Sequence, residues 1–425
     1  MRSLVFNGGY DSRPFASTAE LDLTGFVVST KRSRVLFIAH SAQRGGAEYC
    51  LDTTLRHLDR ERFEPLAVFP HEGPMADAAR TLGMDVVIVP LRHWLYFHKN
   101  WWFWKNLIGR TLPNIGRLTR LIRERQIDLV YTNTSAIFES ALAARRAGVP
   151  HLWHVHEILQ PGTQMSQLLP LRWIQRLIRR YSSHVVFESH GARQVFEKTT
   201  PLKHASVVYN SLRIDPPNHS ADSRDSFRKS HGLEDNDITV GFVGQFMDRK
   251  NPLVLIEALS QLNDIPNLRC VSAGEGPLKS AMQQQLEAHG LNNRCQILPF
   301  QENIVSLLQG IDVLVMPSRQ ESFGLVLVEA GAAGKPVVAC RSQGPDEIIE
   351  HGITGLLVDQ DNPTALASAI RRLVESSALR LEMGTAARER VCRLFDPVVN
   401  TRQLEAIING LLTKTVATPS HSAKN

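Results

Sequence analysis

The chain has 425 residues, 43% of them hydrophobic and 21% charged; this length suits two or three globular domains, and the composition excludes collagen-like, coiled-coil and disordered chains. Its formal net charge is +6, a small excess that suits an anionic ligand or an anionic membrane surface and is too weak to argue for nucleic acid without a matching motif. The cysteines are odd in number and form no Cys-x-x-Cys pair, which argues against a disulfide framework or a structural zinc site and favours a reducing cytosol.

Residues 1–30 are polar and without a pattern, and we expect them to be a flexible leader. They lack the apolar stretch of a secretory signal. No uninterrupted apolar run reaches about 18 residues, the length that a transmembrane helix needs. The sequence therefore predicts a protein that does not span a membrane.

From Arg34 onward, short apolar runs rich in branched residues alternate with stretches of helical spacing. Such runs are typical of parallel strands that are buried on both faces. In the first half of the chain the predicted strands are 34–40, 65–69, 85–90, 128–133, 151–156, 183–189 and 206–210. They indicate a first Rossmann-like domain over 31–211.

The composition changes over 212–237, where Pro, Ser, Asp and Asn predict a linker with one short helix. A second domain is predicted over 238–395, then a final helix over 396–415 and a disordered tail over 416–425. The predicted strands of the second series are 237–244, 268–274, 295–300, 312–318, 335–340 and 354–358. This order predicts an α/β fold of two doubly wound domains facing across a cleft, with ligands bound beyond the carboxyl ends of the strands.

Two loops of the second domain have the composition of phosphate-binding loops. In the first, Gly244 ends a strand, and Arg249 and Lys250 precede a helix, so that close backbone approach, two cations and a helix N-terminus come together. In the second, Gly274-Glu275-Gly276 follows the next strand. An ordinary loop with solvated charges and a tight turn are the alternative interpretations of these two segments.

A third loop carries two carboxylates at a distinctive spacing. Glu321 lies in the loop and Glu329 lies eight residues later in the following helix, a separation of about 12 Å at 1.5 Å per residue. Carboxylates so placed suit the hydroxyls at the two ends of a sugar–diphosphate–nucleoside, with the backbone amides between them facing the anion. The alternative is two unrelated surface glutamates.

Several of these segments match the motifs of one known family. The matching segments are Gly244…Arg249-Lys250-Asn251, Ala273-Gly274-Glu275-Gly276-Pro277-Leu278, Glu321-Ser-Phe-Gly-x4-Glu329, Gly344-Pro345-Asp346-Glu347, Gly355-Leu356-Leu357-Val358, Arg44-Gly45-Gly46-Ala47-Glu48 and Val208-Tyr209-Asn210. Together, over about residues 34 to 395, they resemble the retaining glycosyltransferases of family 4. The resemblance implies the GT-B fold, a first domain that binds the acceptor, and a second domain that binds a nucleoside-diphosphate sugar.

The resemblance also implies roles for single residues. Lys250 would bind the donor diphosphate, Glu321 the donor sugar and Glu329 the ribose hydroxyls, while His156 would lie beside the anomeric carbon. The implied catalytic residues are His156, Lys250 and Glu321, and the implied donor-binding residues are Gly45, Gly46, Gly244, Arg249, Lys250, Gly274, Glu275, Phe323, Gly324, Leu325 and Glu329.

This sequence departs from the family pattern at two positions. The family's Gly-Arg in the first loop of the second domain is Gly244-Gln245 here, and its Asn-Gly is Asn210-Ser211. The first departure removes a cation from the donor diphosphate, and we expect Arg249 to supply it from the same loop.

Other polar residues are assigned structural roles. His151 and His154 alternate on a strand with His156 and lack further ligands, so structural histidines are expected there. Asp359-Gln360-Asp361 resembles a metal-binding motif but precedes Asn362-Pro363, which favours a helix-capping turn. We predict no metal ligand and no cofactor, with cations and helix N-termini stabilising the departing diphosphate instead.

The first domain contains a segment with the composition of a membrane anchor. Four of the six tryptophans lie in this segment, namely Trp94, Trp101, Trp102 and Trp104, with Lys99, Lys105 and Arg110 nearby. The segment 171–180 adds four arginines and no acidic residue. Tryptophan with interspersed basic residues is typical of an interfacial segment. The alternative is that the aromatics form core and the arginines a solvated face. No RNA- or DNA-binding motif is present, so no nucleic-acid partner is predicted.

The sequence therefore predicts a cytoplasmic, metal-independent, retaining hexosyltransferase on the inner face of the cell membrane. Its predicted partners are a nucleotide-sugar donor, a lipid-linked or surface-polysaccharide acceptor, and anionic membrane. Two alternatives remain open: a GT-B sugar-nucleotide epimerase, which needs no acceptor, and a non-catalytic sugar-nucleotide-binding or membrane-docking module, which Gln245 would suit.

Overall fold

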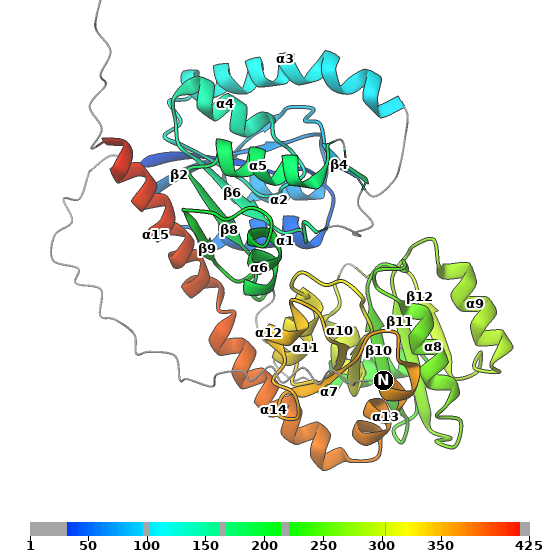
Figure 1. The fold of residues 1–425 in the computed structure, drawn as a ribbon. Coiled ribbons are helices and arrows are strands. Elements are labelled where there is room, and N and C mark those ends of the chain that lie inside the picture. The colour runs from blue at the N-terminus through cyan, green and yellow to red at the C-terminus, as the bar shows by residue number, and fades with distance from the viewer. Residues whose placement is uncertain are drawn as a thin grey trace, which may run out of the picture.

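The structure is a computed structural model that describes residues 32–96, 102–160, 166–167, 169–213, 221–301 and 303–416. Two parallel sheets, each covered by helices on both faces, form two α/β units (Figure 1). This arrangement confirms the predicted fold class. The predicted leader and the tail beyond residue 416 lie outside the described residues.

The first sheet has seven parallel strands in the order β3-β2-β1-β5-β6-β8-β9. Its strands are β1 (Ser33–Ile38), β2 (Phe63–Phe69), β3 (Asp85–Ile88), β5 (Leu129–Thr132), β6 (His151–Val155), β8 (His184–Phe187) and β9 (Ala205–Val207). Its helices are α1 (Gly46–His57), α2 (Pro74–Thr81), α3 (Trp102–Glu124), α4 (Glu139–Ala147), α5 (Leu171–Tyr181) and α6 (His190–Glu197). Apolar runs such as Val35 to Ile38 are fully buried because helices cover both faces of the sheet.

The second sheet has six parallel strands in the order β12-β11-β10-β13-β14-β15. Its strands are β10 (Ile238–Val243), β11 (Leu268–Ala273), β12 (Cys295–Leu298), β13 (Val313–Met316), β14 (Val337–Cys340) and β15 (Gly355–Val358). Its helices are α7 (Ala221–Ser230), α8 (Pro252–Ser260), α9 (Lys279–Ala288), α10 (Val305–Gly310), α11 (Leu325–Ala332), α12 (Pro345–Ile348), α13 (Pro363–Val374) and α14 (Ser377–Leu394). Each face of this sheet has its own apolar cluster, one beneath α8, α9 and α13 and the other beneath α10, α11 and α14.

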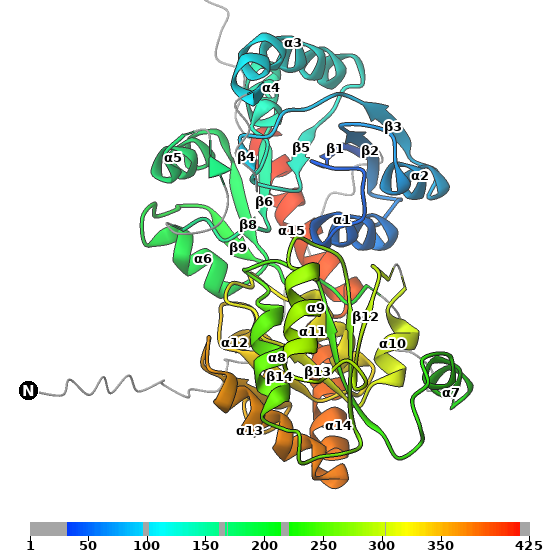
Figure 2. The ribbon, with the colours of Figure 1, turned by 90° about the vertical axis from the view of Figure 1, so that its right-hand side faces the viewer.

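The last helix, α15 (Pro397–Val416), joins the two units. It follows the second domain in sequence, yet Leu404 and Ile408 are buried in the apolar cluster of the first domain, among residues of α1 and β1. Figures 1 and 2 show α15 running from the second domain along the first. The chain thus crosses between the domains twice, once through residues 208–213 and once through α15.

A short ribbon that the sequence did not predict lies beside the first sheet. The strands β4 (Leu95–Tyr96) and β7 (Ser166–Gln167) pair antiparallel. Trp94 precedes this ribbon and is 1% exposed; its ring stacks on Phe138, and its indole N–H donates to the Ser135 carbonyl 2.5 Å away. For Trp94 the core alternative is therefore right, whereas the side chains of Trp101, Trp102 and Trp104 lie outside the described residues.

Candidate active site

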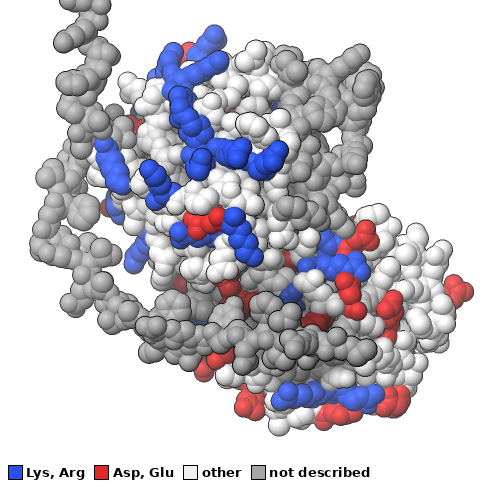
Figure 3. Space-filling view, in the orientation of Figure 1, with Lys and Arg blue, Asp and Glu red and all other residues white. Residues whose placement is uncertain are grey.

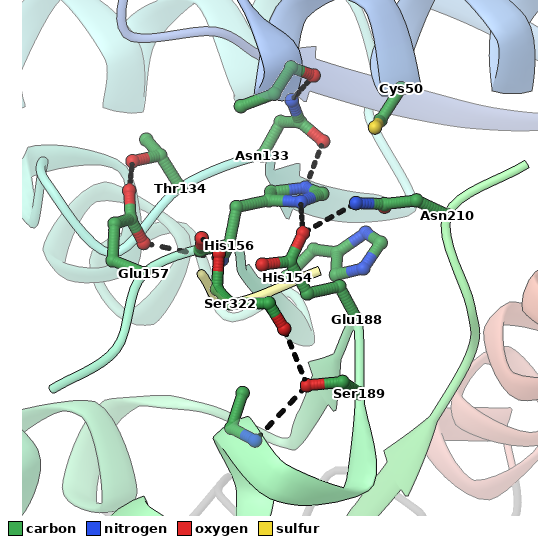
Figure 4. Close-up of polar contacts among 12 residues, drawn as sticks. Cys50, Asn133, Thr134, His154, His156, Glu157, Glu188, Ser189, Asn210 and Ser322 are labelled. Carbon is green, nitrogen blue, oxygen red and sulfur yellow. Dashed lines mark hydrogen bonds and ion pairs between the residues drawn. The ribbon is translucent and has the colours of Figure 1, made fainter. Parts of the chain in front are cut away.

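Loops at the carboxyl ends of both sheets meet at the interface between the domains. Ser189, at the start of α6, donates a hydrogen bond from its hydroxyl to the Ser322 carbonyl (2.8 Å), and the Ser322 hydroxyl donates to the His156 carbonyl (3.1 Å) (Figure 4). From α12, Glu347 accepts a hydrogen bond from the backbone N–H of Gly191 (2.6 Å). These contacts bring the predicted donor loop of the second domain against the predicted catalytic histidine of the first.

Lys250 and Glu321 form an ion pair at this interface. Their side chains are only 13% and 9% exposed. Burial lowers the pKa of Lys250, and the neighbouring Glu321 carboxylate opposes that shift. A buried amine needs a counter-charge, and Glu321 supplies it.

The second predicted carboxylate, Glu329, is also buried and also paired. It lies on α11, is 4% exposed, and its Oε1 is 2.7 Å from Nε of Arg213. Burial raises the pKa of Glu329 to about 7, and Arg213 acts against this shift. The burial of both Glu321 and Glu329 rules out the interpretation as two unrelated surface glutamates.

Between these carboxylates the chain turns sharply into α11. Gly324 precedes the helix with φ of 103°, in the left-handed region that favours glycine. A Cβ at this position would lie 3.0 Å from Leu327 Cδ1 and 3.3 Å from Glu321 Cγ. Phe323 is 2% exposed and anchors the turn in the core, so that residues 323–325, which separate the two carboxylates in the sequence, are held at the start of α11.

The Gly274-Glu275-Gly276 turn packs against the loop that contains Gly244. A Cβ at Gly274 would lie 1.9 Å from the Gly244 carbonyl oxygen, and the N–H of Phe246 donates to the Glu275 carbonyl at 2.9 Å. These glycines therefore permit close backbone packing of two loops at the strand ends. The Glu275 carboxylate is exposed and pairs with Lys279 at 3.1 Å, so its side chain is not brought to the interface with the other predicted donor residues.

Arg249 stands next to the residue that departs from the family pattern. Its Nη2 donates a hydrogen bond to the Gln245 side-chain oxygen at 3.1 Å. The guanidinium of Arg249 therefore contacts the side chain of Gln245, which stands at the position of the arginine in the family pattern. This geometry supports the expectation that Arg249 replaces that charge, which stays a prediction.

His156 is the centre of a buried hydrogen-bond network (Figure 4). Its Nδ1 lies 3.1 Å from Glu188 Oε2, and its Nε2 lies 3.1 Å from Asn133 Oδ1. The Asn133 amide is oriented by donating to the Ala47 carbonyl at 2.7 Å, and Asn210 donates to Glu188. These contacts hold the ring on both of its nitrogens, between Glu188 and Asn133.

The other two histidines of β6 are structural. His154 Nδ1 lies 2.5 Å from the Tyr131 hydroxyl, and His151 Nε2 lies 2.8 Å from the Thr132 hydroxyl. Burial lowers the pKa of His151 to about 3 and that of His154 well below its ordinary value. Both rings are therefore neutral inside the sheet, as the sequence predicted.

The glycine loop before α1 faces the second domain. A Cβ at Gly45 would lie 2.6 Å from Glu48 Oε2, and one at Gly46 would lie 3.7 Å from Leu325 Cδ1 at the start of α11. Glu48 is 4% exposed and lies 2.9 Å from His40 Nδ1. A side chain at Gly45 would therefore meet the Glu48 carboxylate of its own domain, whereas Gly46 brings this loop to van der Waals distance of the start of α11.

The sequence did not single out several polar residues of this interface. Glu188 and Asn133 follow β8 and β5, and Arg213 follows the last strand of the first domain. Inspecting every polar residue just beyond a predicted strand would have found Glu188 and Asn133. No comparable signal marked Arg213.

Across the described residues no three His, Cys, Asp or Glu side chains are grouped as a metal ion would require. Asp361 accepts hydrogen bonds from Asn251 (2.9 Å) and Arg319 (2.7 Å), and Asn362 caps α13. The aspartates around residue 360 therefore form a turn and a helix start.

Two sequence families match successive parts of the chain. The family described as Glycosyltransferase Family 4 matches residues 44–215, and the family described as Glycosyl transferases group 1 matches residues 223–390. Together they cover every strand of the two sheets except β1.

Among curated proteins, the N-acetyl-alpha-D-glucosaminyl L-malate synthase of Bacillus anthracis is 28% identical over 59% of this chain and 66% of its own length. The UDP-Gal:alpha-D-GlcNAc-diphosphoundecaprenol alpha-1,3-galactosyltransferase of Escherichia coli is 24% identical over 68% of this chain and 77% of its own length. The matched region thus spans about two thirds to three quarters of these two relatives.

Solved structures extend the likeness to both domains together. The structure of Anabaena HepE in complex with UDP-glucose has a TM-score of 0.75 and 26% identity, over 89% of this chain and 99% of that one. A sucrose-phosphate synthase from Thermosynechococcus elongatus shares the fold with a TM-score of 0.72 at 18% identity, over 90% of this chain and 100% of that one.

Proposed function

The chain belongs to the group 1 glycosyltransferases of family 4 with the GT-B fold, and on that premise we propose that it transfers a sugar from a nucleoside-diphosphate sugar to a lipid-linked or surface-polysaccharide acceptor. The reaction retains the anomeric configuration and needs no metal ion. The observation that carries the proposal is the arrangement around α11, where two buried carboxylates, each paired with a cation, flank the amides at the helix start.

The charges of this arrangement suit the departure of a diphosphate. When the bond between the anomeric carbon and the phosphate oxygen breaks, the electron pair goes to the diphosphate and positive charge develops on the sugar ring. In this proposal Lys250 and the amides before α11 stabilise the negative charge. Glu321 then exchanges its lysine partner for the donor sugar, and Glu329 binds the ribose.

His156 completes the site from the first domain. Its ring is fixed on both nitrogens by Glu188 and Asn133, and its carbonyl accepts a hydrogen bond from Ser322 of the donor loop. A rigid group at this point would orient the donor sugar toward an acceptor held by the first domain. We assign no covalent nucleophile.

A lipid-linked acceptor is supported by one relative and by the surface of the first domain. The E. coli relative is described as acting on a diphosphoundecaprenol-linked sugar. In this chain α5 buries Leu171, Ile174 and Ile178, while Trp173 is 49% exposed. The exposed arginines of α5 and α3 are Arg172, Arg176, Arg179, Arg180, Arg117, Arg120 and Arg123.

These arginines gather on one side of the first domain. Figure 3 shows the blue residues as a broad group over α3, α4 and α5. Such a surface attracts anionic lipid headgroups. We therefore propose peripheral attachment to the cytoplasmic face of the cell membrane. None of the helices in the described ranges combines the length and apolarity that crossing a membrane requires.

The test is a transfer assay with UDP-, GDP- and ADP-sugars and a lipid-linked saccharide acceptor, in excess chelator. The expected result is nucleoside diphosphate release and a product with the donor's anomeric configuration by NMR. An inverted product, or activity that returns only with Mn²⁺, would contradict the retaining, metal-independent mechanism. Isomerised donor without transfer would indicate the epimerase, and binding without turnover the non-catalytic module.

A further inference from the structure

Arg213 lies at the interface between the domains, in the connection that joins them. The residue before it, Leu212, is 6% exposed in the second-domain core, and its N–H donates to the Phe395 carbonyl at 2.9 Å. This anchor fixes the backbone next to Arg213, whose side chain is 16% exposed. The sequence and the comparisons assign this arginine no role.

The guanidinium of Arg213 contacts one residue from each domain. Its Nε lies 2.7 Å from Glu329 Oε1 on α11, and its Cζ lies 4.2 Å from the centre of the Tyr49 ring on α1. A cation held over a ring face is attracted by the electrons of the ring, more strongly where water is excluded. Arg213 thus bridges the predicted ribose carboxylate and the helix that follows the glycine loop.

We propose that Arg213 positions Glu329 for the ribose of the donor and makes this contact depend on the approach of the first domain. The inference rests on the proposed donor site. Among the described residues, Arg213 is the only side chain that pairs with the Glu329 carboxylate, and it does so through Oε1. The proposal assigns the other oxygen, Oε2, to the two ribose hydroxyls.

Three features favour positioning over a direct phosphate contact. First, Arg213 pairs with Glu329, the predicted ribose carboxylate, whereas Lys250 pairs with Glu321, the predicted contact of the donor sugar. Second, Tyr49 holds the planar guanidinium from the other side, which restricts its rotation. Third, the site has other cations for a diphosphate, namely Lys250 and the adjacent Arg249.

The electrostatics of the pair support the same role. Glu329 is 4% exposed, and this burial raises its pKa to about 7 although Arg213 acts against the shift. An unpaired carboxylate in such surroundings would take up a proton and lose one acceptor site. Arg213 therefore maintains both the charge and the direction of the Glu329 carboxylate.

The test compares UDP with its 2′,3′-dideoxy analogue by calorimetry on the full chain. We expect Arg213→Met to weaken UDP binding about tenfold, the scale of one charged hydrogen bond, and to change binding of the dideoxy analogue less than about twofold. Donor KM should rise with kcat nearly unchanged. Arg372→Met, at an exposed arginine of α13, is the matched control and should behave as the parent.

Tyr49 provides the second arm of the test. Tyr49→Leu, which removes the ring, should reproduce part of the UDP-specific loss, whereas Tyr49→Phe should not. Equal losses of UDP and the dideoxy analogue in Arg213→Met, or no loss of UDP, would overturn the positioning role. A parent protein that bound none of UDP, GDP and ADP would contradict the proposed function itself. A parent that binds one of them, with variants that show no ribose-specific loss, would contradict only the role of Arg213.

Discussion

Replacing Glu321 with glutamine should make the free protein less stable and yet increase its response to nucleoside diphosphate. In the parent, Lys250 pairs with Glu321, and both side chains are nearly buried. Glutamine keeps the shape of the side chain but removes the charge. Lys250 then remains at the interface without a counter-ion, and burial already lowers its pKa.

The magnitude follows from how deeply the pair is buried. Breaking a fully buried ion pair costs about 3–5 kcal/mol, and a pair that water partly reaches costs less, so we expect about 2 kcal/mol. For a domain of this size such a loss lowers the melting temperature by roughly 4–8 °C. UDP should recover most of it, because its diphosphate supplies the missing negative charge without having to displace Glu321 from Lys250.

The assay is thermal unfolding of the parent and Glu321→Gln with and without UDP, or with GDP or ADP if the parent prefers them. UDP should raise the melting temperature of the variant more than that of the parent, while sugar transfer by the variant falls. Glu287→Gln, at an exposed glutamate of α9, is the control for a neutralised charge. Equal melting temperatures and equal shifts with UDP in parent and variant would refute the reasoning.

Three further predictions follow from the charges of the site and surface. Because burial raises the pKa of Glu329 to about 7, the carboxylate is charged above that pH, so UDP affinity measured by calorimetry should fall as pH drops from 8 to 6. Glu329→Gln should bind UDP weakly and independently of pH; a parent with a flat profile would contradict this. Arg249→Ala and Lys250→Ala should each slow transfer about 10²-fold. Adding Gln245→Arg to the Arg249→Ala variant should restore part of the rate. Full activity of Arg249→Ala would show that Arg249 does not replace the charge missing at Gln245. Replacing Trp173 and the arginines of α5 with serine should release the protein from anionic vesicles in a sedimentation assay without changing UDP binding, and continued sedimentation would exclude α5 as the docking surface.

Local pattern predicted the fold well because each domain is built from buried parallel strands. Runs such as Val313–Met316 are apolar at every position, which only a strand covered on both faces requires. The β4–β7 ribbon was not predicted because a strand of two residues is too short to show the alternation of apolar and polar residues, and because its pairing depends on tertiary structure. The packing of α15 on the first domain was not predicted for the same reason, since the apolar face of a helix does not show which surface it will contact.

The sequence predicted the two carboxylates of the candidate site but not the cations with which they pair. Spacing along one loop and helix located Glu321 and Glu329, because their separation is set by local geometry. The partners Lys250 and Arg213 come from other segments, and Lys250 lies 71 residues from Glu321. Long-range ion pairs of this kind depend on how loops from different strands meet, which a single sequence does not specify.

In the proposed reaction, residues at the interface between the domains bind a nucleoside-diphosphate sugar, and the diphosphate is released. The most direct measurement is nucleoside diphosphate release from a panel of UDP-, GDP- and ADP-sugars by the purified full chain, beside Lys250→Met. The account predicts that at least one donor is consumed, that the product retains its anomeric configuration, and that Lys250→Met is inactive while folded. A folded parent that consumes none of the donors, or a Lys250→Met variant as active as the parent, would contradict it.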